Sequence, residues 1–238
     1  MKTLFWIKTL TLLMALPFVN AVNAVTVSVQ VVDKNGKPLP DAVIVLLPTN
    51  KTVKPKIPLS NQPVVAQEKM QFVPAVSIVP LGAKVTFVNN DSWNHHVRAY
   101  AANLSKVEAG KENGFSMMLE GKSSGKKAIS KEVLMDKPGV LGATLLGCFI
   151  HGSMSGHIYV TESPWAAKTN AEGWANFEDA PEGISHFRVW QMDQPVDLPL
   201  QQIDVTAAGA KQVVKLVHVT ARRVRAAPAA ASSSGYAY

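Results

Sequence analysis

The stretch LLGCFIHGSMSGHIYV, residues 145–160, joins two strand-like runs through a glycine-rich loop, an arrangement typical of a β-sheet protein. It holds the one cysteine of the chain, Cys148, followed at steps of three by His151 and Met154. A thiolate, an imidazole and a thioether form a soft donor set that suits copper better than zinc, calcium or magnesium. A loop between two strands can fold such side chains back onto one point. The stretch therefore predicts three ligands of a copper site.

A fourth ligand is available on an upstream strand. One more imidazole would complete a trigonal site of two histidines and a cysteine, with a long axial methionine. The run VTFVNNDSWNHHV, residues 85–97, ends in the pair His95 and His96. Adjacent residues on a regular strand point to opposite faces, so only one of the two can face the metal. The spacing of the run favours His95.

Two other interpretations of this cluster stay open. A free cysteine is often a small apolar residue of the core, and scattered histidines are often structural or solvated. The second interpretation is a tetrahedral zinc site, although a set of one thiolate and one methionine thioether is unfavourable for zinc. His157 is a further donor, but Gly156 separates it from the loop, which favours a surface position or the start of a strand.

The N-terminus is typical of a secretory signal peptide. Residues 1–24 start with Lys2 and Lys8, continue in an apolar run and end in Val-Asn-Ala, a tripeptide that also ends at Ala21. The apolar run is too short to span a membrane comfortably. We therefore expect a periplasmic protein that has no stable membrane insertion after cleavage. Because one cysteine makes no internal disulfide, packed cores must hold the fold.

The charge of the chain excludes one class of partner. Removal of residues 1–24 takes away two lysines and leaves 22 basic and 17 acidic residues, a net charge of +5. The basic residues are scattered and the protein is exported, so we expect no nucleic-acid binding. A modest positive surface would instead steer an acidic partner protein.

The mature chain reads as almost entirely β-strand, with no helical period that persists, which favours a sandwich. The Pro- and Lys-rich stretch 51–63 reads as a linker, and the Ala- and Ser-rich segment 221–238 as a disordered tail. The strands that we expect lie at 25–33, 41–48, 64–80, 82–90, 93–100, 114–119, 128–135, 141–148, 157–160, 175–177, 186–190 and 211–219.

Residues 64–162 resemble the cupredoxins, the small blue copper proteins, and among them the amicyanin-like and plastocyanin-like proteins. V-T-F-V-N-N-D-x-x-x-H matches the strand, turn and first histidine of the family, and C-x-x-H-x-x-M-x-G-x-I-x-V matches its ligand loop and last strand. The resemblance implies a Greek-key β-sandwich that binds one type 1 copper ion. Carried over by position, the ligands are His95, Cys148, His151 and Met154.

The resemblance also implies one-electron transfer to or from a partner protein, not catalysis. In the family the loop histidine lies in an apolar patch that contacts partners, and the residues that match here are Trp93, Phe149, Ile150 and Met154. His96 stands where asparagine is common, which leaves the redox potential and the colour open. A copper-binding protein of homeostasis or delivery is the alternative. A copper enzyme would need further clustered histidines, and only six histidines occur.

Residues 25–50 and 164–220 resemble two halves of a carboxypeptidase regulatory-like module, a small β-sandwich of the transthyretin-like or Ig-like kind. The family patterns are D-x-x-G-x-P-L-x-x-A-x-V in the first half, then T-x-x-x-G-x-A-x-F and P-x-G in the second. Neither half has enough strands to bury its apolar face alone. We therefore expect one discontinuous module with the copper domain inserted. In the alternative, residues 25–48 join the copper-domain sheet and only 164–220 are separate.

Overall fold

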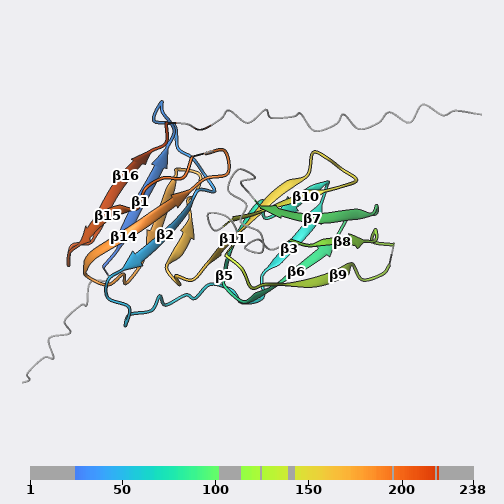
Figure 1. Cartoon of the computed structure of the whole chain (residues 1–238), viewed down its shortest axis with the longest axis horizontal. Coiled ribbons are helices and arrows are strands. Elements are labelled where there is room, and N and C mark those ends of the chain that lie inside the picture. Colours follow the sequence, from blue (N-terminus) through green and yellow to red (C-terminus); the bar gives the residue numbers. More distant parts are fainter. Residues whose placement is uncertain are drawn as a thin grey trace, which may run out of the picture.

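The computed structural model describes residues 25–101, 114–123, 125–138, 143–194, 196–217 and 219. This part of the chain forms sixteen β-strands and no helix, which confirms the predicted all-β class (Figure 1). The signal peptide predicted at 1–24 and the tail predicted at 221–238 lie outside the described residues. Among the described residues, no helix is long and apolar enough to cross a membrane.

Most strands alternate β-branched or aromatic side chains with polar ones, so that one face of each strand enters a core. In β1 (Val27–Val32), for example, Val27, Val29 and Val31 are fully buried. The other strands are β2 (Val43–Pro48), β3 (Val64–Glu68), β4 (Gln71–Val73), β5 (Val76–Pro80), β6 (Ala83–Asn89), β7 (His95–Ala101), β8 (Ser116–Leu119), β9 (Ile129–Met135), β10 (Ala143–Cys148), β11 (Ser155–Thr161), β12 (Ala166–Lys168), β13 (Trp174–Phe177), β14 (Gly183–Trp190), β15 (Gln201–Val205) and β16 (Ala210–Lys215).

The first and last described segments of the chain form one β-sandwich. β1 is the central strand of sheet 1, of order β13-β1-β16, and β2 lies inside sheet 2, of order β12-β2-β14-β15. The two sheets share a core that includes Ile44, Trp165 and Phe187. Residues 25–48 thus pair with strands that follow residue 164. The domain bounds themselves stay a prediction.

A second β-sandwich is formed by the middle of the chain. Sheet 3 has the order β5-β11-β10-β7-β8 and sheet 4 the order β4-β3-β6-β9. Within sheet 3, β10 lies between its antiparallel neighbours β7 and β11. The core between the sheets includes Phe87, Leu119 and Ile158, together with Cys148 and Met154. This order of strands brings the predicted ligand loop beside the strand that starts at His95.

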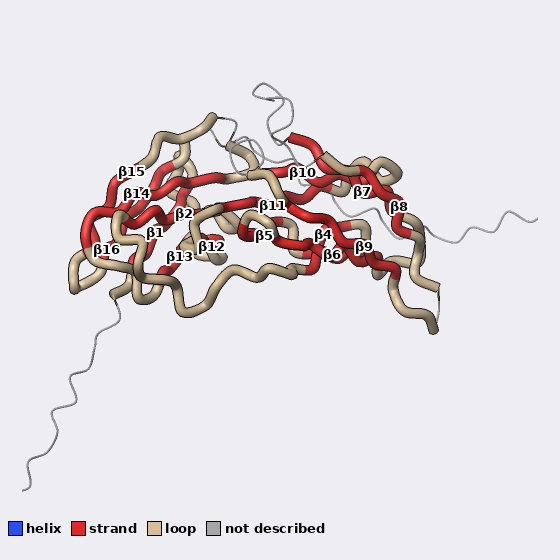
Figure 2. Tube along the Cα trace, turned by 60° about the horizontal axis from the view of Figure 1, so that its bottom comes forward, coloured by secondary structure: helices blue, strands red, loops and turns tan. Residues whose placement is uncertain are grey.

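The two sandwiches contact each other through sheets 2 and 3. In Figure 2 the two groups of strands meet near β5, β11 and β12. A third apolar cluster joins Val43 and Val45 of β2 to Val76 and Tyr159 of sheet 3. Beside it, Lys168 Nζ donates a hydrogen bond of 2.8 Å to the carbonyl oxygen of Val76. Part of the outer face of sheet 2 and part of that of sheet 3 are therefore buried against each other.

The structure differs from the predicted strands at several places. β12 and β15 were not predicted, and the run predicted at 64–80 forms the three strands β3, β4 and β5. β11 begins two residues and β14 three residues earlier than expected, and β16 ends at Lys215 and not at residue 219. β15 has the sequence QQIDV, in which only Ile203 and Val205 enter the core. Two apolar residues in an edge strand are too few to show the two-residue period of a strand.

Candidate metal centre

The predicted ligand loop connects β10 to β11 at one end of the second sandwich. Cys148 is the last residue of β10, and its neighbour Phe149 donates its backbone N–H to the carbonyl oxygen of His96 at 2.8 Å. Met154 donates its backbone N–H to the carbonyl oxygen of His151 at 2.9 Å. These bonds fold the loop against the beginning of β7 and so direct His151 toward Cys148.

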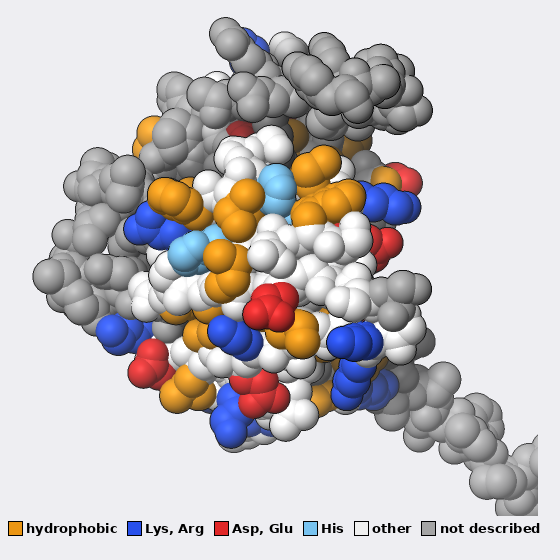
Figure 3. All heavy atoms as spheres, turned by 90° about the vertical axis from the view of Figure 1, so that its right-hand side faces the viewer, with side chains coloured by type: hydrophobic (Ala, Val, Ile, Leu, Met, Phe, Trp, Pro, Cys, Tyr) orange, Lys and Arg blue, Asp and Glu red, His pale blue; other side chains and the backbone are white. Residues whose placement is uncertain are grey.

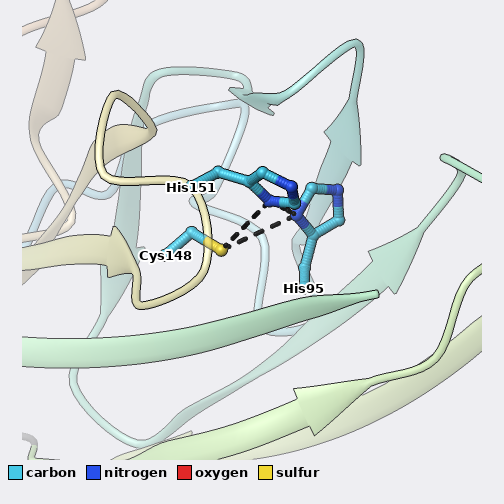
Figure 4. Close-up of side chains that lie close together, drawn as sticks. All are labelled: His95, Cys148 and His151. Carbon is cyan, nitrogen blue, oxygen red and sulfur yellow. Dashed lines mark hydrogen bonds between the residues drawn. The ribbon is translucent and has the colours of Figure 1, made fainter. Parts of the chain in front are cut away.

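Three of the four predicted residues bring their donor atoms together (Figure 4). Cys148 Sγ lies 3.7 Å from Nδ1 of His95 and 3.6 Å from Nδ1 of His151. The two Nδ1 atoms are 3.1 Å apart. His95 is fully buried as the first residue of β7, and Cys148 is nearly so.

The spacing of the three atoms fits a trigonal metal ion. A triangle with sides of 3.1, 3.6 and 3.7 Å has a centre about 2.0 Å from each corner. Bonds from a metal such as Zn²⁺ to imidazole nitrogen are about 2.0–2.1 Å long, and those to thiolate sulfur about 2.3 Å. Two imidazoles and one thiolate in a plane form the donor set of a blue copper site. The residues therefore fit copper.

Met154 and His96 differ in their surroundings. Met154 is 3% exposed and belongs to the same core cluster as Cys148, so the prediction that it lies in an exposed apolar patch is wrong. Its role as axial ligand stays a prediction. His96 directs Nε2 to Ser116 Oγ at 2.8 Å, toward the neighbouring strand β8. Among the described contacts, the side chain of His96 makes none with Cys148.

His157 is not part of the group. It lies within β11, where its ring contacts Trp190 edge-on with the ring centroids 5.2 Å apart. Trp190 also contacts Tyr159, with centroids 5.7 Å apart. His157 therefore belongs to the contact between the sandwiches.

The environment of His151 favours its neutral form. Burial and the neighbouring His95 ring lower the pKa of His151 below its usual value, against an opposing effect of the Asp91 carboxylate. Neutral imidazole is the form that offers a lone pair to a metal ion. His151 is thus prepared to bind a metal near neutral pH.

Sequence reasoning missed one residue of the site, Asp91. Its Oδ2 lies 2.8 Å from Nε2 of His95, and its two oxygens accept the backbone N–H groups of Lys69 at 2.6 Å and Met70 at 3.0 Å. Burial raises the pKa of the Asp91 carboxyl, but the hydrogen bonds from Met70, His95 and Lys69 outweigh it and hold that pKa below its usual value. The sequence feature that could have indicated Asp91 is the position of this acid four residues before the predicted ligand His95, in the run NNDSWNHH.

An exposed apolar patch surrounds the outer side of the group. Phe149 is 68% exposed, and Ile150, Trp93 and Met118 are also exposed. The guanidinium of Arg98 lies 5.6 Å from the centre of the Phe149 ring. Figure 3 shows this end of the molecule, where hydrophobic side chains gather around histidines and lie beside Lys and Arg side chains. We call Trp93, Met118, Phe149 and Ile150 the apolar patch.

Comparisons with known proteins give the following findings. No family model matches the chain, and no curated protein matches it. A copper-containing nitrite reductase from Thermus scotoductus SA-01 is similar over 56% of this chain and 28% of its own, with 22% identity and a TM-score of 0.33. Amicyanin from Paracoccus versutus is similar over 49% of this chain and 97% of its own, with 20% identity and a TM-score of 0.31.

Proposed function

We propose that the chain is a periplasmic blue copper protein of the cupredoxin kind, which transfers single electrons. One type 1 copper ion would be held by His95, Cys148 and His151, with Met154 as the fourth ligand. The observation that carries this proposal is the meeting of the three donor atoms, 3.1 to 3.7 Å apart, at the end of a packed β-sandwich.

The bound copper would supply a Cu(II)/Cu(I) couple. The chain's own part is to hold the donors in one arrangement for both states. His95 and Cys148 are anchored in the neighbouring strands β7 and β10, and the hydrogen bond from Met154 N–H to the His151 carbonyl oxygen stiffens the loop. Burial of His95 and Cys148 excludes water from these two side chains. Small motion of the ligands means little reorganisation for each electron.

The electron would pass to a partner protein through the apolar patch. His151 is partly exposed and lies next to exposed Ile150 in the loop. We propose a redox partner whose docking face is apolar with acidic groups around it, since Arg98 borders Phe149 and the mature chain carries a net charge of +5.

A carrier is proposed here and not a copper enzyme. Within the described ranges, one group of three or more His, Cys, Asp or Glu residues can hold a metal, namely His95, Cys148 and His151. We further propose that residues 25–50 and 164–220 are one carboxypeptidase regulatory-like module around the copper domain 64–162. The pairing of β1 and β2 with strands after residue 164 supports it.

The test separates electron transfer from copper delivery. The copper-loaded protein is titrated with ascorbate and then with ferricyanide, and Cu(I) affinity is measured by competition with a chromophoric chelator. A carrier shows an intense blue band that disappears on reduction, returns on oxidation, and keeps its copper throughout. Tight Cu(I) binding without the band would contradict the proposal and support delivery.

A further inference from the structure

Asp91 connects the buried ring of His95 to a surface turn. Its Oδ2 lies 2.8 Å from Nε2 of His95 and accepts the N–H of Met70 at 3.0 Å, while its Oδ1 accepts the N–H of Lys69 at 2.6 Å. Asp91 is 7% exposed. Both oxygens therefore face backbone N–H donors, which leaves the carboxylate no role except that of acceptor toward His95.

This arrangement decides which ring nitrogen of His95 carries the proton. A neutral imidazole has one N–H and one lone pair. Because Asp91 only accepts, Nε2 must hold the N–H, and Nδ1 is left with the lone pair. Nδ1 is the atom that faces Cys148 and His151, at 3.7 Å and 3.1 Å.

We propose that Asp91 is a positioning residue, which fixes the tautomer and the ring orientation of His95 so that the Nδ1 lone pair is presented to the metal. The proposal rests on the proposed function for the identity of the metal. Its claim about the His95 ring concerns the metal-free chain, so the two can fail separately.

The turn at Lys69 and Met70 is shaped to hold the carboxylate. Both residues have positive φ, 52° and 58°, in the two-residue connection between β3 and β4. Such turns usually need Asn or Gly at these positions, because side chains disfavour the left-handed region. Here the strained conformation directs two successive N–H groups at one carboxylate. The hydrogen bonds to Asp91 give a reason for the turn to persist without glycine.

Asn89 fixes the backbone of Asp91 from the other side. Its Oδ1 accepts the N–H of Asp91 at 3.0 Å. Its Nδ2 donates to the carbonyl oxygens of Trp93 at 2.9 Å, Leu119 at 3.1 Å and Glu120 at 3.0 Å. The loop that leads into His95 is thus tied to β8 and cannot shift independently of it.

The Asp91→Asn variant breaks this arrangement without a change of size. One of its two terminal atoms becomes an NH₂ donor, and it must face the N–H of either Lys69 or Met70. An NH₂ group toward His95 would donate to Nε2 and move the ring proton to Nδ1, toward Cys148. The matched control is Glu68→Gln, which removes one exposed negative charge at the end of β3, beside the same turn.

The experiment records ¹⁵N–¹H correlation spectra of the histidine rings in the metal-free wild type, and copper affinity in wild type and both variants. We expect the Nε2–H tautomer of His95 in wild type and in Glu68→Gln, with equal copper affinity. Asp91→Asn should show Nδ1–H and bind copper at least tenfold more weakly, with its backbone amide spectrum still folded.

An Nδ1–H tautomer in the metal-free wild type would overturn the proposal, and this measurement needs no variant to fold. An unchanged copper affinity in an Asp91→Asn protein whose His95 carries the proton on Nδ1 would overturn it as well. If the predicted tautomer is found but copper gives no blue band, the proposed function fails and the positioning role of Asp91 stands.

Discussion

Cys148 meets two requirements at once. Its side chain packs in the core between sheets 3 and 4, and its sulfur also lies within 3.7 Å of two imidazole nitrogens. The apolar-core and metal-ligand interpretations of this cysteine are therefore not exclusive. A buried thiol beside two nitrogen donors is protected from solvent and still available to a metal.

Met154 is the residue through which we expect the redox potential to change without loss of copper. In Met154→Gln an amide oxygen would replace a thioether, and the harder donor favours Cu(II) over Cu(I). We expect the copper content and the blue band to remain, and the potential to fall by about 60 mV or more, a tenfold change in the Cu(II)/Cu(I) ratio. Cyclic voltammetry measures it, and an unchanged potential would contradict the axial role of Met154.

Residue patterns predicted three donor atoms that the structure brings together, but not the residues that support them. Cys148, His151 and Met154 stand in one short loop, and donor chemistry alone links them to His95. Asp91 was missed, because its role depends on the Lys69–Met70 turn, which lies more than twenty residues earlier and meets it only in the folded chain. No local period of the sequence reports such a contact.

At the scale of elements, the connections around the site differ in how tightly they are packed. Gly121 follows β8, and its N–H donates to Asn94 Oδ1 at 2.8 Å. A Cβ at Gly121 would overlap the backbone carbonyl of Ser92, whereas a Cβ at Gly152, inside the ligand loop, would meet open space. The connection after β8, which lies against the loop before His95, is thus more crowded than the ligand loop.

This contrast predicts that a substitution at Gly121, outside the ligand loop, is more harmful than one at Gly152, inside it. Gly121→Ala should lower the free energy of unfolding by about 1–3 kcal/mol, because the contact is with backbone and cannot yield easily. It should also weaken copper binding, since Ser92 lies in the loop that leads to His95. Gly152→Ala should leave both unchanged. Urea unfolding and copper titration measure them, and a larger effect at Gly152 would contradict the packing described.

Strand prediction succeeded where apolar side chains are numerous. β2 reads as a continuous apolar run, VIVLLP, and its first four residues are buried because both of its faces are covered. β15 failed because it contributes only Ile203 and Val205 to the core. Alternation therefore locates central strands but not weak edge strands.

At the scale of the whole molecule, the contact between the sandwiches lies away from the metal centre. β10 begins at Ala143, which is buried in this contact, and ends at Cys148 in the site. Sheet 2 therefore covers one end of sheet 3 and leaves the apolar patch open to a partner. The sequence did not predict this contact, because alternation shows that a face is apolar but not what covers it.

Tyr159 reports on this contact through its ionisation. Burial raises the pKa of Tyr159 from 10.0 to about 12, with smaller effects of Arg188 and Asp197. Above pH 10 the unfolded chain loses this proton while the folded chain keeps it, so stability is complete below pH 10 and is lost as the pH rises toward 12.

Tyr159→Phe should remove this part of the alkaline loss. At pH 11 the variant should gain about 1.4 kcal/mol in free energy of unfolding relative to wild type, compared with the same difference at pH 8. Urea unfolding at the two pH values measures it, and the pH 8 pair serves as the control. An equal alkaline loss in both proteins would show that Tyr159 is not buried in this contact.

The most direct test of the metal centre is the absorption spectrum of the Cu(II)-loaded protein, compared between wild type and Cys148→Ser. We expect an intense blue charge-transfer band in wild type and none in the variant, because the band requires the Cys148 thiolate bound to copper. The same spectrum in both proteins, or no band in wild type, would contradict the assignment of the site.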